Sequence, residues 1–125
     1  MSVDQTQQVI DRYFEVMVAG GDFSRSYADE VSCIMLDADI EIRGPVAVRD
    51  YMIALHAQMS PMHTRSIVVS DGAAYLEGDC PDPDRGESHR IAYCVAYDIT
   101  GDRITAMRCY GSLGSMTTRI NPAST

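Results

Sequence analysis

The stretches Arg103-Ile-Thr-Ala-Met-Arg-Cys-Tyr110 and Val9-Ile-Asp-Arg-Tyr-Phe-Glu-Val-Met-Val-Ala-Gly-Gly-Asp22 together decide the fold predicted for this chain. The first has the composition of a strand, and the second has apolar side chains at helical spacing before a pair of glycines. Ionisable groups recur among the apolar residues of both. A helix laid over a curved sheet encloses a pocket, so polar groups on the covered face would line a small-molecule site.

The length and the charge of the chain limit its function. Its 125 residues suit one domain with a single core, 46% of them are hydrophobic, and the formal net charge is −8. An acidic domain lacks the basic surface that phosphate backbones require, so we expect no nucleic-acid partner. No apolar run approaches the ~20 residues of a membrane helix, and the N-terminus has no signal pattern. We therefore expect a cytoplasmic protein that does not act at a membrane.

The four cysteines stand far apart in the sequence and form no C-x-x-C pair. A structural zinc site needs closer pairing, and a disulfide framework is typical of secreted proteins. We expect Cys33, Cys94 and Cys109 to be reduced thiols packed in strands. No metal site is predicted.

Three helices are predicted. An apolar stripe predicts the first at residues 5–19, Asp22 caps a short second helix that ends near residue 28, and Pro45 opens a third that ends at Ser60-Pro61. Strands are predicted at 31–36, 63–70, 73–80, 88–99 and 103–112, with antiparallel hairpins at the two short turns that contain glycine. Residues 1–112 would form one domain, and residues 113–125, rich in Gly, Ser and Thr, a flexible C-terminal tail.

This order of elements predicts an α+β fold in which three N-terminal helices pack on a strongly curved antiparallel sheet. The helices and the concave face of the sheet would enclose a cone-shaped pocket. A mainly apolar pocket with a few polar groups is the usual setting of a ligand site.

Alternation along each strand predicts which side chains face this cone. In 88–99 the odd positions are larger and more apolar, so His89, Tyr93 and Tyr97 are expected to point inward. In 73–80 apolarity alone favours the even positions, which would leave Glu77 and Asp79 in solvent. Neither face of 103–112 is cleanly apolar, so one inward position there is expected to be polar.

Short motifs spread over nearly the whole chain carry a resemblance to a known family. They are Arg12-Tyr13 with 19–22, 28–31, Gly44-Pro-Val-Ala-Val-Arg-Asp-Tyr51 and 101–110. In these motifs the chain resembles the nuclear-transport-factor-2-like (NTF2-like) superfamily, particularly its polyketide-cyclase (SnoaL-like), ketosteroid-isomerase and scytalone-dehydratase branches. The resemblance implies a cone-shaped α+β fold, a homodimer formed through the outer face of the sheet, and no organic cofactor.

The resemblance to ketosteroid isomerases carries over one functional residue. Tyr13 matches the helix position at which those enzymes place the tyrosine that donates to the substrate oxyanion. Their base matches Met35 and their second oxyanion donor matches Val95, and both positions are apolar here. The resemblance therefore implies an oxyanion donor without the usual base.

Two other branches match at polar strand residues. Asp79 matches the strand carboxylate of limonene-epoxide-hydrolase-like members, although Glu77 replaces their partner arginine, and this alignment turns Glu77 and Asp79 toward the pocket. His63 and His89 lie near the positions that scytalone-dehydratase-like members fill with a pair of histidines. The two alignments imply a site built from strand residues.

The predicted catalytic residues are His63, His89, Asp79 and Tyr13. Histidine titrates near neutral pH, and strand pairing is expected to bring His89 close to Asp79 or His63, so these residues suit acid–base chemistry. Tyr13 is either an oxyanion donor or a core tyrosine. The predicted substrate-binding residues are Glu77, Tyr75, Tyr93, Tyr97, Arg108 and Tyr110, with an ion pair to Arg90 or Arg108 as the other role considered for Glu77.

These residues predict a cofactor-free lyase or isomerase that acts on a small hydrophobic cyclic or polyketide-like molecule. The reaction would be dehydration, isomerisation or cyclisation through proton abstraction. Two alternatives stay open. One is epoxide opening by water activated at Asp79, and the other is a non-catalytic small-molecule-binding or dimerisation module.

Overall fold

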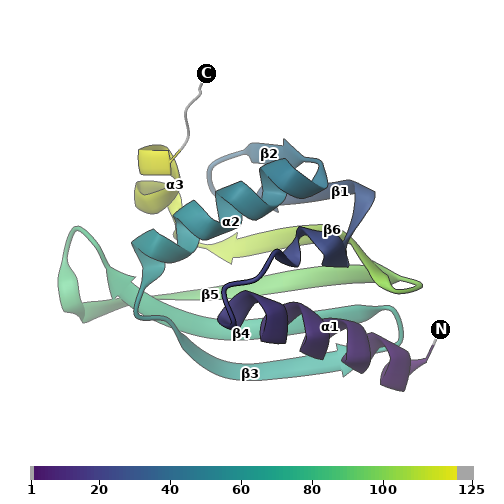
Figure 1. The fold of residues 1–125 in the computed structure, drawn as a ribbon. Helices are drawn as coiled ribbons and strands as arrows, with labels where there is room; N and C mark the ends of the chain where they lie inside the picture. Colours follow the sequence, from purple (N-terminus) through teal and green to yellow (C-terminus); the bar gives the residue numbers. More distant parts are fainter. Residues whose placement is uncertain (1, 121–125) are drawn as a thin grey trace.

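The computed structural model describes residues 2–120, in which three N-terminal helices lie on one side of a curved sheet (Figure 1). Helix α1 spans Val3–Val18. Ser2 caps its N-terminus, because the Ser2 hydroxyl accepts a hydrogen bond from the Gln5 N–H at 3.2 Å. The buried Thr6 hydroxyl donates to the Ser2 carbonyl at 2.9 Å and accepts from the Gly72 N–H at 3.0 Å. These bonds tie the start of α1 to a turn of the sheet.

The second and third helices follow the predicted signals closely. Asp22 caps the short 3₁₀ helix η1, Phe23–Ser26, by accepting from the Ser24 N–H at 3.1 Å. Helix α2 spans Pro45–Met59, with Gly44 before it at φ 95°, a backbone conformation that glycine adopts without strain. Arg49 of α2 donates to the Asp22 carboxylate at 2.9 Å, so the ion pair joins the two helices. The prediction of three N-terminal helices is confirmed.

The sheet has six strands in the order β2-β1-β6-β5-β4-β3. Strands β3 to β6 form the predicted antiparallel meander. Two features were not predicted from the sequence: the short strand β2, and the parallel pairing of β1 with β6, which makes the sheet mixed. The strands span β1 Tyr27–Met35, β2 Ile40–Arg43, β3 His63–Ser70, β4 Ala73–Asp82, β5 Gly86–Thr100 and β6 Arg103–Gly111.

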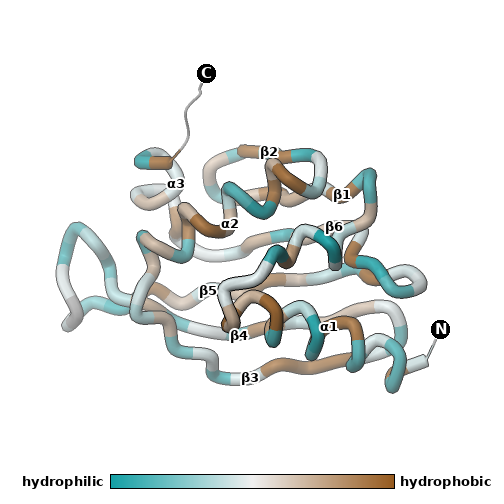
Figure 2. Tube along the Cα trace, in the orientation of Figure 1, coloured by the Kyte–Doolittle hydropathy of each residue, from teal (hydrophilic) through white to brown (hydrophobic). Residues whose placement is uncertain are grey.

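The helices cover one face of the sheet, which we call the inner face. Figure 1 shows α1 over β3 and β4, and α2 over the half of the sheet that contains β1 and β2. In Figure 2 hydrophobic residues recur along both helices and within the strands, whereas the β4–β5 turn is hydrophilic. The core therefore fills the layer between the helices and the sheet.

Strand register decides which side chains reach this core, because directly paired residues point to the same face. Tyr93 and Tyr97 of β5 are 6% and 4% exposed, which confirms that the odd positions of β5 face inward. Tyr93 pairs with Gly78 of β4, where an added Cβ would lie 2.7 Å from the tyrosine hydroxyl oxygen. The even positions of β4 therefore share the inner face. The expectation that Glu77 and Asp79 point into the cone is wrong, because they lie one residue out of phase.

The C-terminal segment differs from its prediction. Residues Gly114–Ile120 form helix α3, which packs against α2, and Leu113, Met116 and Thr117 are buried. Burying the Leu113 and Met116 side chains stabilises such a helix by about 1.5–3 kcal/mol each. The prediction of a flexible tail is therefore wrong for residues 113–120, where Leu113 and Met116 are buried and Ile120 packs against the core. Residues 121–125 lie outside the described part of the chain.

Candidate functional site

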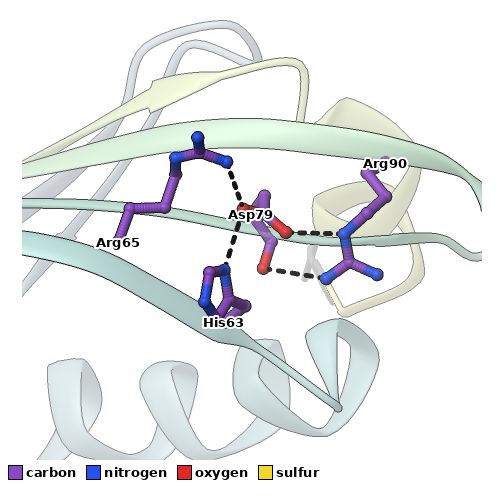
Figure 3. Close-up of polar contacts among 4 residues, drawn as sticks. All are labelled: His63, Arg65, Asp79 and Arg90. Carbon is purple, nitrogen blue, oxygen red and sulfur yellow. Dashed lines mark hydrogen bonds and ion pairs between the residues drawn. The ribbon is translucent and has the colours of Figure 1, made fainter.

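Two of the predicted catalytic residues, His63 and Asp79, meet at the ends of β3 and β4. They are paired in register, and His63 Nδ1 lies 3.2 Å from Asp79 Oδ2. Arg65 donates to the same oxygen at 3.2 Å, and Arg90 of β5 donates to Asp79 Oδ1 at 2.5 Å. Figure 3 shows the three basic side chains pointing toward one carboxylate, and we call the four residues the Asp79 cluster. Sequence reasoning had not identified Arg65.

The Asp79 cluster stabilises the ionised carboxylate. Hydrogen bonds from Arg90, His63 and Arg65 lower the pKa of Asp79 to about 2, although the residue is only 7% exposed. A carboxylate with so low a pKa is a weak base at neutral pH. The cluster lies on the outer face of the sheet, because Asp79 is out of phase with the inward Gly78 and Cys80.

His89 does not join the Asp79 cluster. Its Nδ1 lies 3.2 Å from the Arg85 carbonyl oxygen and 3.1 Å from the Ser88 hydroxyl, both in the β4–β5 hairpin, and the side chain is exposed. By alternation along β5 it belongs to the face of Tyr93, opposite to Asp79. The expected approach of His89 to Asp79 or His63 is therefore wrong.

The outer face also carries several side chains that were predicted to line the cone. Tyr75 and Tyr110 are 44% and 45% exposed, and their strand partners, Ala96 and Cys94, share this face. Arg108 forms an ion pair with Asp98 at 2.8 Å, which satisfies its charge without a substrate. The inward placement expected for Tyr75, Tyr110 and Arg108 is wrong; only Tyr93 and Tyr97 of that set face inward.

The inner face holds a group of aromatic side chains around Tyr13. Its hydroxyl lies 2.7 Å from the hydroxyl of Tyr27, and its ring contacts those of Phe23 and Tyr97. Burial, followed by the nearby Tyr27 and Tyr97, raises the pKa of Tyr13 well above its usual value. Two hydroxyls that share one hydrogen bond keep one O–H hydrogen, so the pair remains able to donate to a third oxygen.

Tyr51 of α2 is a candidate site residue that was not among the site residues predicted from the sequence. It is 8% exposed, and its hydroxyl oxygen is buried without a hydrogen-bond partner among the described residues. Burial, with smaller effects from Cys33, Cys109 and Asp37, raises its pKa to about 12. Its hydroxyl therefore stays protonated at neutral pH and is a donor without an acceptor. A tyrosine in an otherwise apolar helical stripe was the signal available in the sequence.

Two cavities border the helices. One of about 390 Å³ lies between β2 and α2 and is lined by Tyr51 and Ile120 among others. A larger groove of about 1150 Å³ lies beside α1, η1 and the β5–β6 turn. Within residues 2–120 no three potential ligands gather in a way that would hold a metal ion. None of the helices described is long and apolar enough to cross a membrane.

Comparison with solved structures identifies the architecture. A steroid delta-isomerase from Pseudomonas aeruginosa has a TM-score of 0.76 and 11% identity over 93% of this chain and 90% of its own. An NTF2-like protein from Burkholderia xenovorans LB400 has a TM-score of 0.70 and 14% identity over 97% and 99%. A de novo designed protein with a curved β-sheet has a TM-score of 0.72 and 12% identity over 95% and 99%.

These likenesses establish the NTF2-like fold of the chain. The fold that the sequence motifs implied is thus confirmed. No protein-family model and no curated protein sequence matches the chain. Identities of this size define the fold and leave the reaction open.

Proposed function

We propose that this protein binds a small, mainly apolar molecule beside Tyr51 of α2, which lines the cavity of about 390 Å³ between α2 and β2. The observation that carries the proposal is the buried Tyr51 hydroxyl, which has no acceptor among the described residues. Leaving a buried polar group unpaired costs about 1–3 kcal/mol, so native proteins almost always satisfy such groups. A ligand oxygen that accepts from Tyr51 would remove this cost.

The core cluster to which Tyr51 belongs contains five methionines, a composition that suits an adaptable binding site. The buried methionines of the core are Met35, Met52, Met59, Met107 and Met116. Methionine is unbranched and polarisable, and cores and surfaces that accept varied apolar partners often use it. One structural neighbour is a steroid delta-isomerase, which supports a cyclic apolar ligand. The ligand class is therefore a cyclic ketone or phenol with one acceptor oxygen.

The proposal is tested with Tyr51→Phe and a panel of cyclic ketones and phenols. In the free protein the replacement removes an unpaired hydroxyl, so the free energy of unfolding is expected to stay constant or rise by up to about 1 kcal/mol. Affinity for the bound panel member, measured by calorimetry, is expected to fall roughly tenfold.

Tyr75→Phe is the matched control, because it removes the same atom from an exposed tyrosine of the outer face. Its affinity is expected to equal that of the wild type. The proposal is wrong if no panel member binds the wild type, or if Tyr51→Phe binds ligand as well as Tyr75→Phe does.

Acid–base catalysis is a second candidate, supported by the contact between His63 and Asp79. In this version His63 moves the proton and Asp79 orients its ring. Substrate would have to reach the outer face. Water activation by Asp79 alone is disfavoured, because its pKa of about 2 makes it a weak base.

Turnover of hydroxy ketones by dehydration or isomerisation tests this candidate. His63→Gln is expected to lower turnover more than tenfold, whereas His89→Gln, which changes an exposed histidine outside the Asp79 cluster, is expected to leave it unchanged. Equal turnover in both variants would assign proton transfer to other groups.

We also propose that the outer face pairs with a second copy of the chain. The exposed apolar side chains Val68, Tyr75 and Tyr110 lie there, around the small residues Ala92 and Ala96. Charge complementarity supports a second copy as the partner. The Asp79 cluster brings two arginines to one carboxylate, and Glu77 on the same face forms no ion pair within residues 2–120.

A further inference from the structure

The groove of about 1150 Å³ lies apart from the ligand site proposed above. Its walls are the exposed side of α1, the residues around η1, and the β5–β6 turn. Figure 1 shows α1, the start of β1 and the β5–β6 turn at one end of the molecule, opposite α3. The groove is thus a separate surface feature built by three segments distant in sequence.

Three arginines from those three segments line the groove: Arg12 of α1, Arg25 of η1 and Arg103 at the β5–β6 turn. Arg103 pairs with the neighbouring Asp102 at 2.9 Å. Arg12 and Arg25 form no ion pair with any residue in 2–120, although acidic residues outnumber basic ones by 18 to 10 in the chain. Two uncompensated guanidinium groups therefore face one groove of an acidic protein.

The acidic residues of the groove do not supply the missing partner. Hydrogen bonds from the Ser24 hydroxyl, from Arg49 of α2 and from the Ser24 N–H lower the pKa of Asp22 to about 2. Arg49 pairs with both Asp22 and Asp50, and Asp102 pairs with Arg103. The three arginines and two aspartates that line the groove leave it a net charge of +1 in an acidic protein, and two of the arginines, Arg12 and Arg25, have no carboxylate partner within residues 2–120.

The residues that line the groove indicate which kind of ligand it could bind. Val9 and Val16 of α1 line the groove and are only partly buried, so they offer an apolar strip beside the arginines. Guanidinium groups bind phosphate oxygens with paired hydrogen bonds, and a phosphate monoester carries about two negative charges at neutral pH. A phosphate monoester presents three terminal acceptor oxygens, enough for Arg12 and Arg25 to bind at once with paired hydrogen bonds, whereas a single carboxylate presents only two.

We propose that this groove binds an organic phosphate monoester, whose phosphate contacts Arg12 and Arg25 and whose apolar part lies on Val9 and Val16. The site is independent of Tyr51. A ligand in the groove would touch the first helix, the 3₁₀ helix and a sheet turn at once.

The experiment is a titration of the full chain with phenyl phosphate, followed by amide chemical shifts and calorimetry. Saturable binding is expected, with shifts concentrated in α1, η1 and residues 100–103. Arg12→Gln and Arg25→Gln are each expected to weaken binding about tenfold or more. Arg43→Gln is the matched control, because it makes the same charge change at an exposed arginine of β2 outside the groove. Both groove arginines are exposed, so the variants should unfold at the wild-type temperature.

Further titrations distinguish the groove from the Tyr51 site and from a general attraction of anions to arginine. Tyr51→Phe is expected to bind phenyl phosphate as the wild type does, so failure of one proposal leaves the other standing. Benzoate and inorganic phosphate are expected to bind more weakly than phenyl phosphate. Equal weakening by Arg12→Gln and Arg43→Gln, shifts centred on Tyr51, or no saturation at millimolar ligand would each overturn the proposal. Equal affinity for inorganic phosphate would overturn its organic part.

Discussion

Asp79 illustrates how neighbouring side chains decide what a carboxylate can do. Its position on β4 was predicted as a catalytic one, and the structure surrounds it with Arg65, Arg90 and His63. These donors stabilise the charged form, which favours a structural or interface role over proton abstraction. Neither arginine is close to Asp79 in sequence, so only strand pairing brings the cluster together.

The low pKa of Asp79 predicts a dependence of stability on pH. The ordinary pKa is 3.8 and the folded value is about 2, so the unfolded chain binds the proton more readily between these pH values. The stabilising contribution is complete above about pH 4 and is lost as the pH falls toward 2. Asp79→Asn is expected to lower the Tm at pH 6, and its difference from the wild type should shrink as the pH approaches 2.

Glu77→Gln controls for the change in net charge, because it alters an exposed residue of the same strand. Its Tm at pH 6 is expected to stay near that of the wild type. Thermal unfolding followed by circular dichroism at several pH values makes the measurement. A Tm difference for Asp79→Asn that stays constant from pH 6 to pH 2 would contradict the assignment.

Helix α3 forms where the sequence predicted a flexible tail. Its residues are mostly small and polar, the composition of a mobile end, yet Met116 is buried and Ile120 packs against the core. Local propensity is a weak guide to a short helix, because tertiary packing supplies most of its stability. The longer helices were easier to predict, since each carries an apolar stripe and a clear end signal.

The docking of α3 predicts an asymmetric effect of two replacements in one helix. Met116 is fully buried, so Met116→Ala is expected to lower the free energy of unfolding by about 2–4 kcal/mol. Thr118→Ala changes an exposed residue of the same helix and is expected to change it by less than about 0.5 kcal/mol. Chemical denaturation of both variants checks this. Equal, small effects would mean that α3 does not pack in solution.

At the scale of the whole molecule, the two faces of the sheet differ in burial and in composition. The inner face is covered by helices and holds the aromatic group and Tyr51, whereas the outer face exposes apolar side chains beside paired charges. An uncovered sheet face of this composition is typical of a protein interface. The shared fold of the structural neighbours leaves both the ligand and the assembly to experiment.

The proposed homodimer predicts how two matched variants will sediment. Val68→Glu places a charge on the outer face, where Val68 is 58% exposed, and is expected to shift the chain from dimer to monomer. Val46→Glu makes the same change on α2, where Val46 is 55% exposed, and is expected to stay dimeric. Analytical ultracentrifugation over a range of concentrations distinguishes the states. A wild type that is monomeric throughout, or equal dissociation of both variants, would contradict the interface.

The sequence by itself determined the three N-terminal helices, the hairpins and the α+β class, because apolar periodicity, caps and glycine turns act between residues close along the chain. Only the tertiary structure decided which polar groups meet. A shift of one residue in register moves every side chain of a strand to the other face. Apolarity turned the even positions of β4 inward, as the structure does, whereas the family resemblance turned Asp79 and Tyr75 inward. The unpaired Tyr51 hydroxyl and the meeting of Arg12 and Arg25 in one groove arise from contacts between distant segments, which no local pattern records.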